Sequence, residues 1–452
     1  MNAALPLRAK LLYASSSLGG EALSQSRGLW LLYFYSPPED ANLERQLPRL
    51  LVGVLLVAGR VLEAFDDALI GYWSDRTRSR WGRRIPFIVL ATPPWALFGV
   101  LVFAPPDGGN VSTAVYLFVV LELFFLFATL TGGPYEALLP EIAPRNEDRL
   151  KVVGIRVYFG AAGAAVGLVL SGVLVDWIGF AGMAVAIGAL ALVARYVGLA
   201  GVWERAKASR RIAAISFREA MRTTFSNRNF LLFLPTFILF QVGFQMLVGV
   251  LPFYVNAVLR VEEEGTWAAV LSAVAICAML AGLPLFARFA LRTSKRQAYR
   301  TALLASAIVF PLAALPGLVP LLPAEAELLL LMVIVGVPIA GNYLFPATLT
   351  ADIIEDDSAR TGMRREATYY GTQNLVEKTA TSFAPLVLVL LLLLGDTSDN
   401  TLGIRLVGPA AGAIVLAGYV IFRRYDLPDE DRVNARVGPN GRAADAVRTG
   451  ST

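Results

Sequence analysis

The sequence predicts an all-α polytopic membrane protein with twelve transmembrane helices in two six-helix bundles. Of its 452 residues, 56% are hydrophobic and only 17% are charged, which is far from the balance of a soluble globular domain. Apolar stretches of roughly 20 residues recur along the chain, each long enough to cross about 30 Å of hydrocarbon as a helix. Stretches such as 386–394 are apolar all round. This favours helices over the alternating strands of a barrel.

The expected spans divide into two sets of six around the longest polar break, which covers residues 203–229. The spans are expected at 11–35, 48–74, 85–105, 112–140, 151–175, 181–202, 228–256, 266–287, 301–320, 326–352, 367–395 and 402–422. We therefore expect an N-terminal bundle at 1–202, a cytoplasmic linker at 203–229, a C-terminal bundle at 230–422 and a disordered cytoplasmic tail at 423–452. Two related six-span halves around a midplane site are typical of a secondary transporter.

The basic residues lie on one side of this predicted topology. Loops 75–84, 141–151, 203–229, 288–300 and 353–366 carry 23 Lys and Arg residues, against Arg45, Arg49 and Arg260 on the other side. The positive-inside rule therefore predicts a multi-pass protein of the plasma (inner) membrane with both termini in the cytoplasm. No continuous basic face is seen, so we expect no nucleic-acid partner.

Composition also limits the chemistry. Histidine is absent, so an ion site must use carboxylates, amides and hydroxyls. The lone Cys277 cannot form an internal disulfide, and we expect it to fill space inside the eighth span. No G-x-x-x-x-G-K-[ST] motif for ATP is present. We expect no enzyme activity and no resident cofactor or metal beyond a coupling ion.

The second span carries charges that need an explanation inside a membrane. Arg60, Glu63 and Asp67 are spaced to share one helix face. Two neighbouring carboxylates repel each other, which raises one pKa or recruits a cation such as Na⁺, Li⁺ or H⁺. The alternative is a structural salt bridge through Arg60.

The first and fourth spans carry further polar positions. Glu21 could accept hydrogen bonds from a solute, or it could pair with Arg27 or Lys378 purely for stability. In the fourth span a polar stripe recurs every seven residues, and glycines interrupt it where backbone could approach a ligand or pack tightly against another helix. The stripe comprises Glu122, Thr129 and Glu136.

The eleventh span has a polar row near its middle, formed by Gln373, Asn374, Glu377 and Lys378. A buried ammonium at Lys378 needs a carboxylate partner. Glu63, Asp67 and Glu21 are the candidates.

The stretch from Arg60 to Pro86 joins an acidic span to the loop Asp75-Arg-Thr-Arg-Ser-Arg-Trp-Gly. It resembles the glycoside-pentoside-hexuronide cation symporters, the melibiose permease family of the major facilitator superfamily. Further matches lie in both halves of the chain, at 134–141, Arg156, 351–353, 364–366 and 373–378. The resemblance therefore implies the major facilitator fold throughout.

The resemblance also implies roles for individual residues. Glu63, Asp67 and Thr129 fall on cation-binding positions. The positions matching the solute site are Glu21, Arg156, Tyr343, Gln373, Asn374 and Lys378, and those matching a gate or latch are Asp75, Arg76, Arg83, Arg84, Glu141, Asp352 and Arg364.

Three positions depart from the family pattern. Glu63 replaces an aspartate, Ala68 replaces a proline, and Gly132 stands where the family has a second sugar-binding aspartate. The longer side chain at Glu63 changes the ion cavity, and the galactoside site is incomplete.

We therefore expect a monomeric symporter in membrane lipid that couples Na⁺ or H⁺ to a sugar, glycoside or related small polar solute by alternating access. One alternative is a carrier of an amphipathic or anionic solute, received by Arg27, Arg156 and Lys378. Another is a membrane sensor or platform that does not transport.

Overall fold

The computed structural model describes residues 4–60, 63, 77, 79–107, 109–143, 145–208, 225–318, 322–361 and 366–427, and this part of the chain is built from helices. Residues 49–60 form a helix after α1. The labelled elements are α1 (Leu7–Tyr35), α3 (Ile85–Leu101), α4 (Asn110–Ala137), α5 (Leu139–Ile142), α6 (Asn146–Ala165), η1 (Val166–Leu170), α7 (Ser171–Ala200), α8 (Trp203–Ala208), α10 (Arg228–Tyr254), η2 (Val255–Leu259), α11 (Glu264–Arg292), α12 (Lys295–Val309), η3 (Phe310–Ala314), α13 (Ala324–Thr361), α14 (Glu366–Thr381), α15 (Ala384–Leu392) and α16 (Leu402–Phe422).

Seven helical stretches of the described chain are long and apolar enough to cross a membrane: Asn110–Ile142, Glu147–Ala200, Arg228–Leu259, Glu264–Arg292, Ala324–Thr361, Thr368–Leu392 and Leu402–Phe422. The apolar helix Ile85–Leu101 is shorter. The first expected span coincides with α1, whose polar residues between Ser15 and Arg27 lower its hydropathy. The all-helical class is therefore confirmed, and the count of twelve and the division into two bundles stay predictions.

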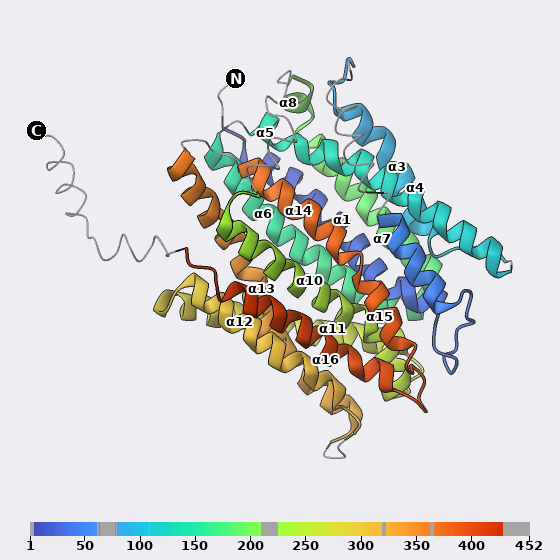
Figure 1. The fold of residues 1–452 in the computed structure, drawn as a ribbon. Helices are drawn as coiled ribbons and strands as arrows, with labels where there is room; N and C mark the ends of the chain where they lie inside the picture. Colours follow the sequence, from blue (N-terminus) through green and yellow to red (C-terminus); the bar gives the residue numbers. More distant parts are fainter. Residues whose placement is uncertain are drawn as a thin grey trace, which may run out of the picture.

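The helices lie side by side as a bundle (Figure 1). α1 packs against α6 and α7, and α3 packs against α4 and α7. Among the later helices, α10 packs against α16, and α11 and α12 pack against α13. Contacts of α1 with α10 and of α7 with α11 join the helices before residue 208 to those after residue 225.

Small residues allow these close approaches. A Cβ atom at Gly167 in η1 would lie 2.5 Å from the carbonyl oxygen of Ala22, so only glycine fits where α1 crosses this turn. Gly179 has φ 74° and interrupts α7. This break falls between the expected fifth and sixth spans, where the sequence places a change of direction.

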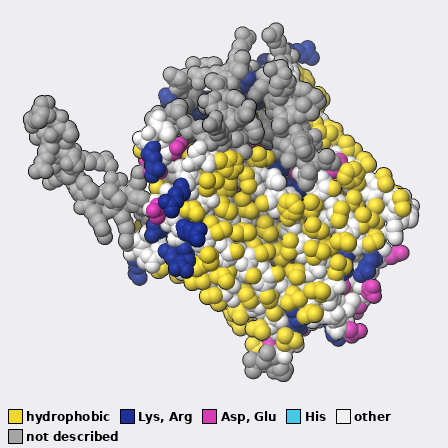
Figure 2. Space-filling model, in the orientation of Figure 1, with side chains coloured by type: hydrophobic (Ala, Val, Ile, Leu, Met, Phe, Trp, Pro, Cys, Tyr) yellow, Lys and Arg dark blue, Asp and Glu magenta, His cyan; other side chains and the backbone are white. Residues whose placement is uncertain are grey.

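The outer surface is apolar over a broad area. Hydrophobic side chains cover most of the described surface on the face shown in Figure 2, and charged side chains gather towards its edges. Large apolar side chains are strongly exposed along several helices, among them Leu90, Val111, Trp177 and Leu291. A patch of this size requires lipid or protein to cover it.

Cys277 is exposed on α11. The expectation that it fills space inside the protein is therefore wrong, because an apolar residue on a membrane helix is equally suited to the lipid face. At the end of the described chain, Tyr425 is buried and stacks on Phe422 with 4.8 Å between ring centroids.

Candidate functional site

Glu63 is the centre of a buried ionic contact between distant segments. Its carboxylate lies 2.9 Å from Nη1 of Arg60 and 2.6 Å from Nζ of Lys378. The Glu63 side chain is only 3% exposed, whereas Lys378 on α14 is 33% exposed. Of the three carboxylates considered for Lys378, the structure thus brings Glu63 to it. Asp67 lies outside the described residues.

Arg27 and Arg60 lie on the rings beside this contact. The Arg27 guanidinium is 4.6 Å from the ring centroid of Phe124 and 4.9 Å from that of Phe125. Arg60 lies 4.5 Å from the centroid of Phe125. Phe125 therefore contacts two guanidinium groups. Both are attracted to the electron-rich faces of its ring. Thr129, one turn further along α4, is buried.

A second group of polar side chains gathers from α1, α4, α6, α10, α13 and α14, and we call it the central polar cluster. It comprises Ser17, Glu21, Glu136, Arg156, Gln241, Tyr343 and Glu377. Arg156 donates from Nη2 to Glu136 over 3.1 Å and from Nε to Ser17 over 3.2 Å. Nε2 of Gln241 lies 2.7 Å from the carboxylate of Glu377.

Glu21 belongs to this cluster by its surroundings. It interacts electrostatically with Glu377, Arg156 and Tyr343. Its side chain passes over Gly160 of α6, where an added Cβ would lie 3.6 Å from Cγ of Glu21. Glu21 is exposed although it lies near the middle of α1. The cluster therefore presents polar atoms to an accessible face between helices that are far apart in sequence.

The remaining expected solute residues occupy two environments. Asn374 is exposed on α14. Gln373 is buried and accepts a hydrogen bond from the Thr350 hydroxyl over 2.9 Å, which joins α14 to α13. Thus Gln373 faces a helix contact in this structure, and the central polar cluster does not include it.

Four of the expected latch residues are described. Arg83 and Arg84, at the start of α3, lie 2.5 and 3.0 Å from the carboxylate of Glu141 on α5. Asp352 on α13 pairs with Lys295 of α12 over 3.1 Å. Each of these contacts lies either among the helices before residue 208 or among those after residue 225. Three further latch positions, Asp75, Arg76 and Arg364, lie outside the described residues.

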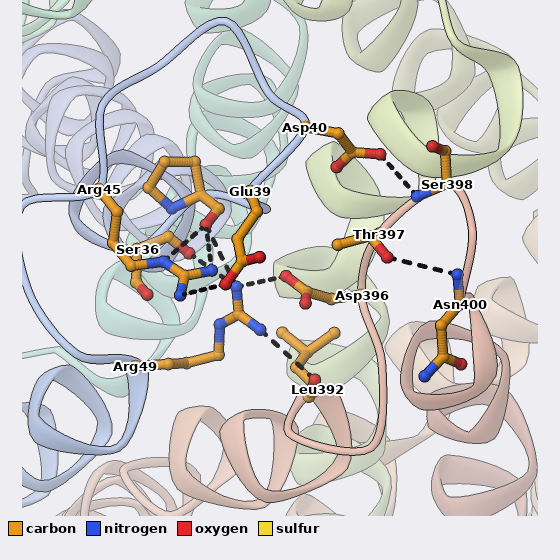
Figure 3. Close-up of polar contacts among 11 residues, drawn as sticks. Ser36, Glu39, Asp40, Arg45, Arg49, Leu392, Asp396, Thr397, Ser398 and Asn400 are labelled. Carbon is orange, nitrogen blue, oxygen red and sulfur yellow. Dashed lines mark hydrogen bonds and ion pairs between the residues drawn. The ribbon is translucent and has the colours of Figure 1, made fainter.

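A buried arginine, for which the sequence pattern predicts no role, joins two loops. Arg49, at the start of the helix 49–60, forms an ion pair with Asp396 in the loop after α15 (Figure 3). It also donates to the carbonyl oxygens of Ser36, Pro37 and Leu392 over 3.3, 3.2 and 3.4 Å. We call these five residues the Arg49 cluster. Arg49 is 6% exposed, so its charge is nearly removed from water.

A neighbouring contact strengthens the same junction. Asp40 accepts a hydrogen bond from the backbone N–H of Ser398 over 2.6 Å (Figure 3). Arg260 donates to the Ser398 carbonyl over 2.8 Å. Partial burial alone would raise the pKa of Asp40, but the hydrogen bonds from Ser398 and the charge of Arg260 lower it below its ordinary value.

Two acidic residues form further contacts between the early and late helices at the end of the protein that carries loops 36–48 and 393–401. Asp176 of α7 accepts hydrogen bonds from the first backbone N–H groups of α11, at Gly265 and Thr266, over 3.0 and 2.5 Å. Glu264 accepts hydrogen bonds from Tyr33 of α1 and from Asn256. The early and late helices are therefore tied together at the end that carries loops 36–48 and 393–401.

Residues 12–406 match the family model described as MFS/sugar transport protein. The chain belongs to this family. Uncharacterized symporter sll1374 of Synechocystis sp. is 29% identical over 167 residues, 36% of this chain and 30% of that protein. Inner membrane symporter YicJ of Escherichia coli is 27% identical over 175 residues, 39% of this chain and 37% of that protein. The chain thus spans about a third of the length of these curated relatives.

The fold resembles that of solved transporters. The crystal structure of the nucleoside transporter NupG has a TM-score of 0.61 at 14% identity, with 94% of this chain and 100% of that chain covered. At this identity the likeness shows the fold alone. The family match and the fold confirm the expected membership of a multi-span membrane transporter family.

Proposed function

We propose that this protein is a secondary symporter of the inner membrane that couples Na⁺ or H⁺ to a sugar, glycoside or related small polar solute. The observation that carries this proposal is the contact of Glu63 with Lys378. A carboxylate that is 3% exposed is held by an ammonium that is 33% exposed. A cation that binds at Glu63 neutralises the Glu63 carboxylate in place of Lys378. The Lys378 ammonium is then free to move away from Glu63.

This exchange of cations supplies a route for coupling. Lys378 lies next to Glu377, which belongs to the central polar cluster. Movement of the Lys378 ammonium therefore changes the charge felt by a solute at that cluster. Cation and solute should raise each other's affinity by the same factor, because coupling between two binding sites is reciprocal.

The contacts at the end that carries loops 36–48 and 393–401 support alternating access. The Arg49 cluster and the contacts of Asp176 and Glu264 tie the early and late helices together at that end. The distribution of basic residues predicts that this end faces away from the cytoplasm. We infer that the solute site at the central polar cluster then opens to the cytoplasm, and that breaking these contacts opens it outward.

The alternative of an anionic solute receives less support. Two of the three cations that it needs are already paired, Arg156 with Glu136 and Lys378 with Glu63. The third, Arg27, lies against aromatic rings.

The proposal is tested with purified protein in liposomes. A panel of labelled hexoses and glycosides is supplied with an inward gradient of Na⁺, an inward gradient of H⁺, or no gradient. We expect at least one solute to accumulate under one gradient only, and a thermal-shift screen to show stabilisation by the same solute and ion together. Stabilisation by a solute with no dependence of uptake on either ion would contradict coupling.

A further inference from the structure

A groove lies where the start of α1 meets the end of α7, and we call it the Arg8 groove. It has a volume of about 490 Å³, within the range of roughly 300–1,000 Å³ that small-molecule sites occupy. Its lining consists of Pro6, Arg8, Ala9, Leu12, Val197, Ala200 and Gly201. Arg8 is the one charged residue among these seven, so the groove combines an apolar lining with a single cation.

Close packing of α1 on α7 closes the base of the Arg8 groove. A Cβ atom added at Gly201 would lie 2.5 Å from Cβ of Leu12. One added at Gly198 would lie 3.2 Å from the Leu12 carbonyl oxygen. The two glycines therefore let the helices touch along this line.

The first turn of α1 is anchored on the side away from Arg8. Asp148 of α6 accepts a hydrogen bond from the backbone N–H of Leu5 over 3.0 Å and pairs with Lys10 over 2.5 Å. Lys10 and Asp148 are 7% and 5% exposed. Positions 8 and 10 are about 200° apart around a helix, so burial of Lys10 directs Arg8 outward. Arg8 is exposed, and within the described chain its side chain forms no ion pair or hydrogen bond.

Exposed apolar side chains flank the Arg8 groove on both helices. Leu7 and Leu11, one turn apart on α1, are 66% and 41% exposed. Val193 and Val197, one turn apart on α7, are 56% and 40% exposed. In a membrane transporter such side chains contact lipid. The groove therefore suits an amphipathic anion, because a small inorganic anion would use the cation and leave the apolar lining uncovered.

The charge distribution predicts on which side of the membrane the groove lies. Arg205 of α8 donates to the carbonyl oxygen of Ala4 over 3.1 Å, which places the start of α1 beside the basic segment 203–229. The positive-inside rule predicts that this side is cytoplasmic. The cytoplasmic leaflet carries anionic phospholipids, and they attract basic residues near its surface.

We propose that the Arg8 groove binds one anionic phospholipid of the cytoplasmic leaflet, such as phosphatidylglycerol. The Arg8 guanidinium holds the phosphate through charge-assisted hydrogen bonds. One acyl chain lies against Leu12, Val197 and Ala200. The bound lipid contacts both α1 and α7 and stabilises their junction, so this site is separate from the central polar cluster and from the transported solute.

The test measures lipid binding to the purified full-length protein by native mass spectrometry. Phosphatidylglycerol and phosphatidylcholine with the same acyl chains are titrated into the protein in detergent, and the dissociation constant of the first bound lipid is determined for each. We expect phosphatidylglycerol to bind at least about fivefold more tightly than phosphatidylcholine. It should also raise the melting temperature more at equal concentration.

Four variants separate the charge of Arg8 from the shape of the groove. Arg8→Gln should abolish the preference for phosphatidylglycerol, and Arg8→Lys should keep most of it. Ala200→Trp fills the groove without changing its charge and should weaken binding of phosphatidylglycerol at least about fivefold. Arg288→Gln removes an exposed arginine of α11 that lies outside the groove and should leave binding unchanged. Thermal melts without added lipid confirm that each variant is folded.

Three results would overturn this inference. Equal affinities of the parent protein for the two lipids would mean that the headgroup is not recognised. Equal losses in Arg8→Gln and Arg288→Gln would mean that phosphatidylglycerol responds to the basic surface as a whole. Full binding by Ala200→Trp would mean that the lipid lies outside the Arg8 groove.

Discussion

Replacing Arg49 by Gln should open the end of the protein that loops 36–48 and 393–401 close. The Arg49 side chain forms the ion pair with Asp396 and three hydrogen bonds to carbonyl oxygens. Its guanidinium also lies 5.5 Å from the ring centroid of Phe253 on α10. The contacts with Asp396, Leu392 and Phe253 join this early segment to the late helices, which must separate for this end to open, whereas those with Ser36 and Pro37 stay within the same loop. Their loss therefore weakens the closed state selectively.

The magnitude follows from the burial of the pair. Arg49 and Asp396 are 6% and 10% exposed, and removing one partner of a buried ion pair costs about 3–5 kcal/mol. A loss of about 3 kcal/mol from the closed state alone raises the ratio of open to closed molecules roughly 150-fold. Asp396→Asn should act in the same direction. The double variant should add little beyond either change, because both remove the same pair.

The assay measures access to a single cysteine. Ser24, exposed on α1 one turn after Glu21, is replaced by cysteine in a background in which Cys277 is serine. Labelling by an impermeant thiol reagent added from the outside should be roughly 100-fold faster with Arg49→Gln, provided that opening is fast relative to labelling.

A second arginine in the same loop provides the control. Arg45 contacts the Pro37 carbonyl and the exposed Glu39, and surface contacts of this kind contribute little. Arg45→Gln should therefore leave the rate at its original value. Equal rates for Arg49→Gln, Arg45→Gln and the parent would refute the role of the Arg49 cluster in closure.

Three further predictions concern topology, gating and packing. Cysteines at Ser79 and Ser294 should react with impermeant reagents only from the cytoplasmic side, because 23 of the loop basic residues lie on that side against three; labelling from outside would reverse the topology. Asp75→Asn should slow transport if its loop acts as a latch, and an unchanged rate would mean that the loop only sets orientation. Gly167→Ala should lower the melting temperature by several degrees, because the added methyl meets the α1 backbone, whereas Gly154→Ala, with open space around it, should not.

Much of the helical organisation could be predicted because hydropathy is a local property. Each expected span overlaps a helix wherever the chain is described, although the ends of spans 85–105 and 301–320 are not helical, and the interruption at Gly179 lies where one span was expected to end and the next to begin. The need of Lys378 for a carboxylate also followed from the cost of an unpaired ammonium in a membrane. The identity of that carboxylate, Glu63, could not be predicted, because it depends on how α14 packs against a segment roughly 300 residues earlier in the chain.

The Arg49 cluster could not be predicted for a related reason. Arg49 bonds mainly to backbone carbonyls of loops, and carbonyl oxygens carry no sequence signature. The one available signal was its position, since Arg49 is among three basic residues on the side that otherwise lacks them. Glu377 was seen as part of a polar row, but its contact with Gln241 of α10 required the packing of two helices.

The most direct test of coupling at Glu63 compares accumulation with exchange. Parent protein, Glu63→Gln and Asp67→Asn are reconstituted at matched levels, and solute uptake driven by a Na⁺ or H⁺ gradient is measured beside exchange at equal solute concentrations. A coupling site predicts that both variants lose the dependence on the ion while exchange persists, because the solute site survives. A structural salt bridge predicts that accumulation and exchange fall together with the melting temperature. Unchanged ion dependence in both variants would contradict the proposed mechanism.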